Sequence, residues 1–250
     1  MFDALRDEGF DVEARNHAEA ILSQEFPDEV AELTAALLEV RIPAAELIGS
    51  GGGEAASTQR MRRQLHAAGW RKHNFRIQTL LDGEPLGDGT GHEIDHVKRA
   101  AAGTLALEIE WNNKDPFFDR DLENFQRLHA QTIISTGIVV TRGAALQATM
   151  TDTVAAYLRA SGAKAEGDLY ATGMKQRTSR QRDAVDRAMS AGADFPTAFA
   201  RAFVSDKFGM ATTHWSKLMD RIARGVGNPC PLLLIGLPAG AVVPYSAAEL

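Results

Sequence analysis

Two glutamates embedded in an apolar run limit how this chain can fold. The run is Gly103-Thr-Leu-Ala-Leu-Glu-Ile-Glu-Trp111, in which Glu108 and Glu110 stand one residue apart. Side chains alternate along a β-strand, so both carboxylates are expected on one face of a sheet. Because ionised side chains are rarely buried without partners, an acid pair inside apolar sequence indicates a special site. The plainer interpretation is an acidic pair on a solvent-facing strand.

A third acid, Asp95, lies in the short alternating stretch His92-Glu-Ile-Asp-His-Val-Lys98. If the two stretches are neighbouring strands, Asp95 can meet Glu108 and Glu110 at one point. Three carboxylates repel one another unless a divalent cation joins them. Oxygen ligands suit Mg²⁺ or Mn²⁺, and such a site is well suited to phosphodiester hydrolysis. The sequence therefore predicts a metal-dependent phosphodiester hydrolase.

The remaining pattern predicts an α/β protein with a central mixed sheet flanked by helices. We expect strands at about 72–81, 92–98, 104–111, 137–141 and 230–237. Amphipathic helices are expected at 11–40 with a break at Pro27, and at 54–69, 117–135, 144–160, 178–191, 196–204 and 214–224. Asp82-Gly83 predicts a hairpin turn. The whole of 1–250 is expected to be a single domain, with 1–48 as its acidic helical N-terminal part.

The net charge of −6 hides an uneven distribution. Residues 1–54 hold 13 Asp/Glu and 3 Lys/Arg, a net of −10, whereas residues 55–250 hold 20 Asp/Glu and 24 Lys/Arg, a net of +4. Six Lys/Arg and no acid lie between Ser57 and Arg76, and a second basic run covers Lys175–Arg182. Local clusters set the attraction to phosphate, so nucleic acid is a candidate partner. The alternative is that both runs are solvated helix faces.

The single cysteine, Cys230, excludes an intramolecular disulfide framework and fits a reducing compartment. The acidic N-terminus lacks the features of a signal peptide, and no apolar stretch approaches the roughly 20 residues that span a bilayer. We therefore expect a soluble, cytoplasmic protein without a membrane partner.

A longer set of motifs resembles a known family. A carboxylate followed by Glu-x-Glu at a strand end resembles the PD-(D/E)xK nuclease core, in the variant where an acid replaces the usual lysine. The segments Gly51–Gln59, His92–His96, Glu108–Asp121 and Ala211–Leu218 together resemble type II restriction endonucleases of the BglII, BstYI and BamHI group. The run Glu-Trp-Asn-Asn-Lys-Asp-Pro-Phe-Phe-Asp-Arg-Asp121 is the most distinctive of them.

The resemblance implies a restriction-endonuclease-like fold and a Mg²⁺-dependent, sequence-specific DNA endonuclease of prokaryotic type. Mn²⁺ is expected to substitute, and Ca²⁺ to support binding without cleavage. Asp95, Glu108, Glu110 and the carbonyl of Ile109 are the candidate metal ligands. Glu110 takes the lysine position and either binds a second metal or orients the attacking water. Glu54 is a candidate fourth acid, the alternative being a helix N-terminal charge.

Candidate DNA contacts follow the acids. Asn112, Asn113 and Lys114 come directly after the predicted catalytic strand, where Asn can read adenine in the major groove. Thr212, Thr213 and His214 stand at a predicted helix start and suit a phosphate clamp. Further candidates are Arg142, Lys175 and Arg177. The alternative for the Asn112–Lys114 stretch is a polar turn before a helix.

The expected partner is double-stranded DNA, read at a short palindrome by a homodimer. Relatives cut sequences centred on GATC and leave 5′ overhangs with 5′-phosphates. A cognate DNA methyltransferase is expected in the same system, without a stable complex. Three alternatives stay open: a nuclease for structured DNA, a non-catalytic DNA-binding module, and a phosphohydrolase for small phosphate esters.

Overall fold

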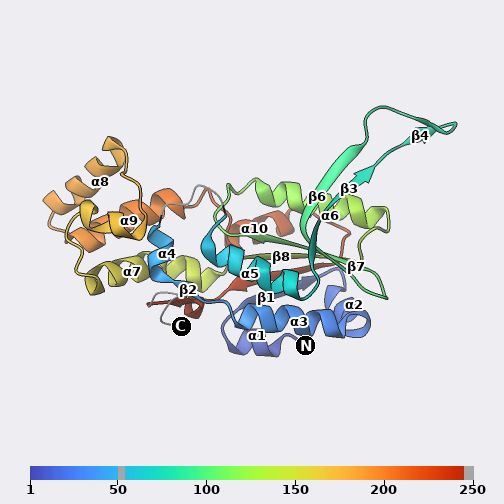
Figure 1. Cartoon of the computed structure of the whole chain (residues 1–250), viewed down its shortest axis with the longest axis horizontal. Helices are drawn as coiled ribbons and strands as arrows, with labels where there is room; N and C mark the ends of the chain where they lie inside the picture. The colour runs from blue at the N-terminus through green and yellow to red at the C-terminus, as the bar shows by residue number, and fades with distance from the viewer. Residues whose placement is uncertain (50–53, 245–250) are drawn as a thin grey trace.

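A six-stranded mixed sheet forms the centre of the computed structural model, which describes residues 1–49 and 54–244 (Figure 1). Its strand order is β1-β9-β8-β7-β6-β3. The strands are β1 Asp11–Arg15, β3 Arg71–Ile77, β6 Thr90–Arg99, β7 Thr104–Glu110, β8 Thr136–Arg142 and β9 Leu232–Leu237. The three central strands β7, β8 and β9 run parallel, and the outer pairings are antiparallel. The predicted α/β class with a central mixed sheet is confirmed.

Helices cover both faces of the sheet (Figure 1). Helices α6 (Phe117–Ala130) and α10 (Trp215–Ala223) lie over one face, which we call the α6 face. Helices α1 (Asp3–Asp7), α2 (Ala18–Glu25), α3 (Pro27–Leu38) and α5 (Ala56–Ala67) lie over the other, the α5 face. Each central strand alternates between two hydrophobic clusters: Leu107 of β7 packs on the α5 face, and Ala106 packs on the α6 face.

Helix α6 lies close to the sheet because of a glycine in β8. A Cβ atom on Gly137 would come within 2.4 Å of the Phe125 ring of α6. Phe118, Leu122 and Phe125 of this helix are fully buried, each contributing roughly 1.5–3 kcal/mol by leaving water. The close packing fixes the position of α6 over the end of β7, where the predicted catalytic glutamates lie.

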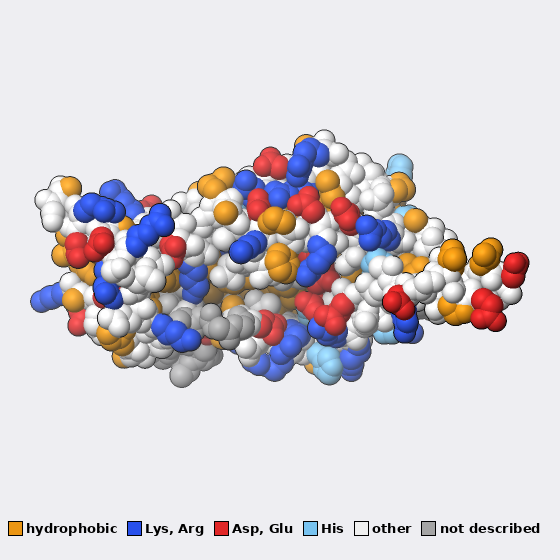
Figure 2. Space-filling model, turned by 90° about the horizontal axis from the view of Figure 1, so that it is seen from above, with side chains coloured by type: hydrophobic (Ala, Val, Ile, Leu, Met, Phe, Trp, Pro, Cys, Tyr) orange, Lys and Arg blue, Asp and Glu red, His pale blue; other side chains and the backbone are white. Residues whose placement is uncertain are grey.

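Smaller elements extend the molecule at both ends (Figure 1). A helical lobe at one end contains α4 (Ala44–Ile48), α7 (Ala144–Ala160), the 3-10 helix η1 (Glu166–Thr172), α8 (Ser179–Ser190) and α9 (Phe195–Lys207). The short parallel pair β2 (Ile42–Pro43) and β10 (Val242–Val243), together with η2 (Ala239–Ala241), adjoins this lobe. At the other end, β3 and β6 lead into a projecting arm tipped by β4 (Leu80–Leu81) and β5 (Glu84–Pro85) (Figure 2).

Most predicted elements are confirmed, and three were wrong in part. The strand expected at about 72–81 is divided, because β3 ends at Ile77 and β4 pairs separately with β5. The arm turns at Asp82-Gly83, both with positive φ, as predicted. The expected helical stretch at 11–40 begins instead with strand β1, whose side chains are only partly buried, so its alternation is weak. The helix expected over 117–135 ends at Ala130, since the chain turns through Thr132 at φ 57°. Residues 51–53 of the first motif lie outside the described residues.

The N-terminal part is thus not wholly helical, because β1 adds an edge strand to the main sheet by pairing with β9. Within the described ranges, no helix is both long and apolar enough to cross a bilayer.

Candidate active site

Glu108 and Glu110 lie on the α6 face of strand β7, as their spacing predicts. Ile109 between them points to the α5 face with Leu107, so the two glutamates continue the line of Ala106 toward α6. Both are buried, with exposed fractions of 3% and 2%. They are therefore neither solvent-facing nor isolated, and the plainer interpretation of a surface acidic pair is wrong.

Asp121 of α6 joins the two glutamates and was not among the predicted site residues. It is 1% exposed and contacts the Glu110 carboxyl. Its Oδ1 accepts a hydrogen bond from Arg120 Nε at 2.8 Å, whereas no described residue donates to Oδ2. The available signal was its place in the helix: Asp121 stands between Phe118, Leu122 and Phe125 on the buried face. A charged residue at such a position indicates a site.

Burial and mutual repulsion raise the pKa values of this carboxyl cluster, which we define as Glu108, Glu110 and Asp121. Burial, followed by the charges of Asp121 and Asp95, holds the pKa of Glu108 well above its usual range. Burial and Asp121 raise the pKa of Glu110 to about 9. Burial also raises the pKa of Asp121, while the neighbouring Arg120 opposes the shift. The cluster holds protons when no cation is bound.

Two polar groups partly compensate the cluster. Asn113 Nδ2 donates to Glu110 Oε2 at 2.8 Å, and Arg120 lies 3.7 Å from Glu110 Oε1. Arg120 is closer to Asp121, at 2.7 Å, and its own side chain is half exposed. One arginine therefore faces three buried carboxyls, which leaves room for further positive charge.

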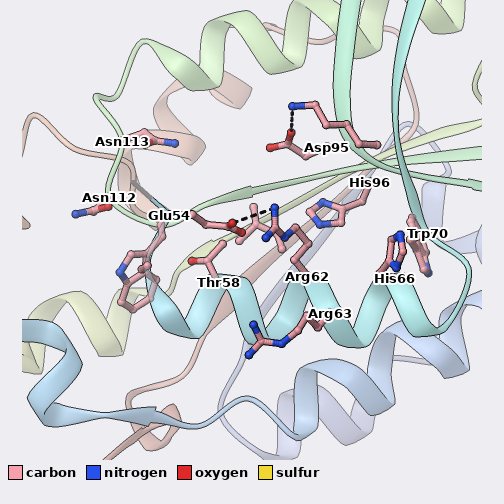
Figure 3. Close-up of a pocket in the computed structure, with 14 residues that line it drawn as sticks. Glu54, Thr58, Arg62, Arg63, His66, Trp70, Asp95, His96, Asn112 and Asn113 are labelled. Atoms are coloured by element: carbon pink, nitrogen blue, oxygen red, sulfur yellow. Dashed lines mark ion pairs between the residues drawn. The ribbon is translucent and has the colours of Figure 1, made fainter. Parts of the chain in front are cut away.

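Asp95 borders the cluster but its carboxylate points elsewhere. The Asp95 backbone N–H donates to Glu108 Oε1 at 3.3 Å, which makes the two residues neighbours. Its side chain is 53% exposed and lies 3.5 Å from Lys72 Nζ (Figure 3). A β-bulge accounts for this direction, because Ile94 pairs with His73 while Val97 pairs with Arg71. The predicted convergence of three carboxylates is therefore incomplete in this conformation.

Glu54 is placed on the other side of β7. It lies just before α5, paired with Arg62 at 3.2 Å (Figure 3). Both residues line a cleft of about 700 Å³ together with Ile109 and Trp111, whose side chains alternate with those of Glu108 and Glu110. Asp95 lines the same cleft and so stands between it and the carboxyl cluster. The structure thus does not bring the Glu54 carboxylate together with the glutamates of β7.

The donor set suits a hard divalent cation, although no finished cage is present. In the described part of the chain, no group of three or more His, Cys, Asp or Glu is arranged to hold a metal ion. The chemistry nevertheless fits: the buried donors are carboxylate oxygens, and the Oδ2 atom of Asp121 is left without a partner among the described residues. Ligation by Asp95, Glu108, Glu110 and the Ile109 carbonyl stays a prediction.

The predicted base-reading loop after β7 is held by a second predicted motif. Lys114 forms an antiparallel bridge with Thr212, and Thr213 N–H donates to the Asn113 carbonyl at 2.8 Å. The side chains of Asn113 and Lys114 are exposed, and Asn112 lines the cleft. The two motifs, about 100 residues apart, thus lie side by side next to the carboxyl cluster. Contacts of these residues with DNA stay a prediction.

Arg142 ends strand β8 and is completely buried. Its Nη2 atom donates to Thr212 Oγ1 and to the Thr213 carbonyl, both at 2.6 Å, and Nη1 donates to Gln147 Oε1 at 2.6 Å. All these acceptors are neutral, and burial lowers the pKa of Arg142 to about 9. In this conformation Arg142 fastens the loop before α10 and presents no side chain to a DNA surface.

The remaining predicted contacts differ in exposure. Thr213 and His214 are buried, and their Oγ1 and Nε2 atoms have no hydrogen-bond partner among the residues that the structure describes. Lys175 is exposed. Arg177 is 8% exposed, with its guanidinium carbon 5.2 Å from the centre of the Phe199 ring. Of this group, only Lys175 is freely accessible as the structure stands.

The chain, including this site, is similar to a known protein family. The family model described as restriction endonuclease BglII/BglIII matches residues 10–237, which is most of the chain. The match includes β6, β7, α6 and the loop before α10. No curated protein sequence matches the chain significantly.

Proposed function

The chain belongs to the BglII/BglIII family of restriction endonucleases, which makes it a type II site-specific deoxyribonuclease acting on double-stranded DNA, and from this premise we propose how it cuts. Members of this family generally use a divalent metal. We propose that Mg²⁺ is the ion here, that Mn²⁺ substitutes for it, and that Ca²⁺ supports binding without cleavage. The products are 5′-phosphate and 3′-hydroxyl ends.

The observation that carries this proposal is the uncompensated charge at the end of β7. The carboxyls of Glu108, Glu110 and Asp121 are almost fully buried, and one half-exposed arginine is the only cation that the described residues set against them. Such a cluster is costly in free energy unless a cation or protons neutralise it. A divalent ion removes this cost and replaces the protons.

Each residue has a separate part in the proposed reaction. Asp95, Glu108, Glu110 and the Ile109 carbonyl would hold the ion, which as a Lewis acid supplies stabilisation of charge on the phosphate. For that role, the Asp95 side chain must leave Lys72 and turn toward Glu108. Glu110, on the same face as Glu108, orients the attacking water and accepts a proton at its carboxylate. The new bond joins the water oxygen to phosphorus, the bond to the 3′ oxygen breaks, and that oxygen takes up a proton.

Asp121 is proposed as a positioning residue. It lies between Arg120 and Glu110, so it holds the guanidinium against the cluster while limiting where the Glu110 carboxylate can move. Glu54 is not placed to act on the same group and serves more simply to pair with Arg62.

DNA recognition is proposed to come from the loop after β7. Asn112, Asn113 and Lys114 contact bases, and Asn113 joins recognition to catalysis through its hydrogen bond to Glu110. Thr212, Thr213 and His214 support that loop and contribute phosphate contacts after local rearrangement, and Lys175 and Arg177 contribute from the helical lobe. Arg142 acts indirectly, by fastening residues 212 and 213.

The assembly is proposed to be a homodimer that reads a palindrome centred on GATC and leaves 5′ overhangs. The 250 residues are proposed to form one catalytic domain, since strands from residues 11 to 237 build a single sheet. A cognate DNA methyltransferase protects the host sites without forming a stable complex.

The test is digestion of a mapped plasmid in Mg²⁺, followed by sequencing of the fragment ends. Discrete fragments with identical 5′ ends at one palindrome are the expected result. A smear would favour a nuclease for structured DNA, and specific binding without any cleavage would favour a non-catalytic module. EDTA is expected to abolish cleavage, and uncut plasmid in every metal would contradict the proposal.

A further inference from the structure

The cleft on the α5 face is lined by donors that the proposed reaction does not use. It lies between α5 and the strands β6 and β7, with a volume of about 700 Å³ (Figure 3). Its wall includes Thr58, Arg62, His66, Trp70 and His96. In Figure 3, Arg62 projects from α5 toward β6, and the His96 ring lies opposite it.

Two buried side chains in this wall lack hydrogen-bond partners. The indole Nε1 of Trp70 has no hydrogen-bond partner in the described ranges. The same holds for both ring nitrogens of His96. His96 is 4% exposed and Trp70 is 1% exposed. A buried donor without a partner destabilises the folded protein, so both groups are poised for an acceptor that enters the cleft. The indole N–H can only donate, so the group that enters must offer a hydrogen-bond acceptor, which phosphate oxygens do.

The charges around the cleft favour an anion. Arg62 is paired with Glu54 at 3.2 Å, and Lys72 lies 2.7 Å from Glu93 and 3.5 Å from Asp95. Arg63 and His66, which also line the cleft, form no ion pair with a described residue. An incoming anion would meet the Arg63 guanidinium, which is unpaired among the described residues, and the unpartnered donors of Trp70 and His96.

We propose that this cleft binds a backbone phosphate of the DNA, separate from the phosphate that is cleaved. The proposal rests on the proposed function, since it takes DNA as the source of the phosphate. Phosphate oxygens accept from indole, imidazole and guanidinium groups without offering a donor. The two phosphates differ because Ile109 and Trp111 face the cleft, whereas Glu108 and Glu110 face α6.

The first experiment observes the unpartnered donors directly. The full-length ¹⁵N-labelled protein is titrated with inorganic phosphate and, separately, with a duplex containing the mapped cut site in Ca²⁺. The Trp70 indole resonance, assigned with a Trp70→Phe variant, is expected to shift with the duplex. A shift with inorganic phosphate alone would assign the cleft to a free phosphate ligand and overturn the proposal. No shift with either ligand would also overturn it.

The second experiment measures affinity in Ca²⁺ as a function of salt. His96→Phe keeps a ring but removes both nitrogens, and Arg62→Ala removes an exposed cation. Each variant is expected to bind the duplex about 5- to 10-fold more weakly, and Arg62→Ala to reduce the salt slope by about 0.9. Arg15→Ala is the matched control, because Arg15 is also half exposed and paired with a glutamate, at 3.0 Å, but lies on β1. It should bind like the unaltered protein.

The two proposals fail in different ways. If the unaltered protein does not cut the plasmid, the proposed function fails whatever the cleft binds. If it cuts, and Arg62→Ala binds with unchanged affinity and salt slope, only the phosphate subsite is overturned. Should His96→Phe fold poorly, Arg62→Ala still decides the outcome, because its side chain is 53% exposed.

Discussion

Strands β7 and β8 run parallel and in register. Each ends in a buried ionisable residue, but the two residues have opposite kinds of neighbours. Arg142 at the end of β8 donates to several neutral oxygens from Gln147, Thr212 and Thr213. Glu110 at the end of β7 meets Asp121, another buried acid, and in the described part of the chain Arg120 is the one cation beside it. A buried charge with satisfied bonds fastens the fold, whereas one surrounded by like charge needs a ligand. Arg142 therefore belongs to the structural framework, and Glu110 to the candidate active site.

The largest effect is expected from removing one carboxylate of the cluster. Glu108→Gln should lower the cleavage rate at least about 1,000-fold, equivalent to about 4 kcal/mol of transition-state stabilisation. Single-turnover digestion in Mg²⁺ measures the rate. Specific binding in Ca²⁺ should survive, which provides the control, and Asp95→Asn should behave likewise. Ordinary turnover by either variant would contradict a catalytic role for these carboxylates. The buried acids at the end of β7 would then be structural, like Arg142 at the end of β8.

Arg142→Met is expected to destabilise the protein by about 3 kcal/mol, since it leaves buried carbonyl and hydroxyl acceptors without donors. Urea unfolding measures the loss. Arg187→Met on the exposed surface of α8 is the control and should change stability little. If Arg142→Met instead lowered DNA affinity at unchanged stability, Arg142 would be a DNA contact and the contrast with β7 would be incorrect.

Asn113→Ala is expected to weaken binding to the cognate duplex by about 1–3 kcal/mol, the value of one good base contact. Binding to random DNA should weaken much less, because phosphate contacts do not depend on this side chain. Competition binding in Ca²⁺ gives both affinities. Equal losses for the two duplexes would make Asn113 a structural partner of Glu110 alone.

The smallest effect, taken per pH unit, is on the pH dependence of the free energy of unfolding. Burial and Asp121 raise the pKa of Glu110 in the folded protein to about 9, above its unfolded value near 4.5. Its contribution to stability is therefore complete below about pH 4.5 and is lost as the pH rises through about 9. In EDTA, the free energy of unfolding should fall across this range by at most about 1.4 kcal/mol per pH unit from this group. Glu110→Gln should flatten the dependence, and an unchanged slope would contradict the assigned cause.

Local sequence patterns predicted the features that depend on residues close together in the chain. The strands β7 and β8 and the common face of Glu108 and Glu110 follow from apolar runs and alternation. Strand β1 was missed because its side chains are only partly buried at the sheet edge. In each case the outcome depends on how clearly buried positions appear as apolar residues in the sequence.

Long-range packing decided the rest. Asp121 enters the cluster only because Gly137 lets α6 approach the sheet, and no local pattern encodes that contact. The structural use of Arg142 depends on residues 212 and 213, some 70 positions later in the chain. The direction of Asp95 depends on a bulge set by pairing with β3. Composition and spacing carry no record of such pairings.

Whether the carboxyl cluster at the end of β7 binds a metal is tested most directly by soaking a crystal of the full chain in Mn²⁺ and measuring anomalous scattering. We predict a peak at about 2.0–2.6 Å from carboxylate oxygens of Glu108 and Asp95, with the Asp95 side chain turned away from Lys72. A peak confined to exposed acids such as Glu93, with the cluster at the end of β7 still metal-free, would contradict it.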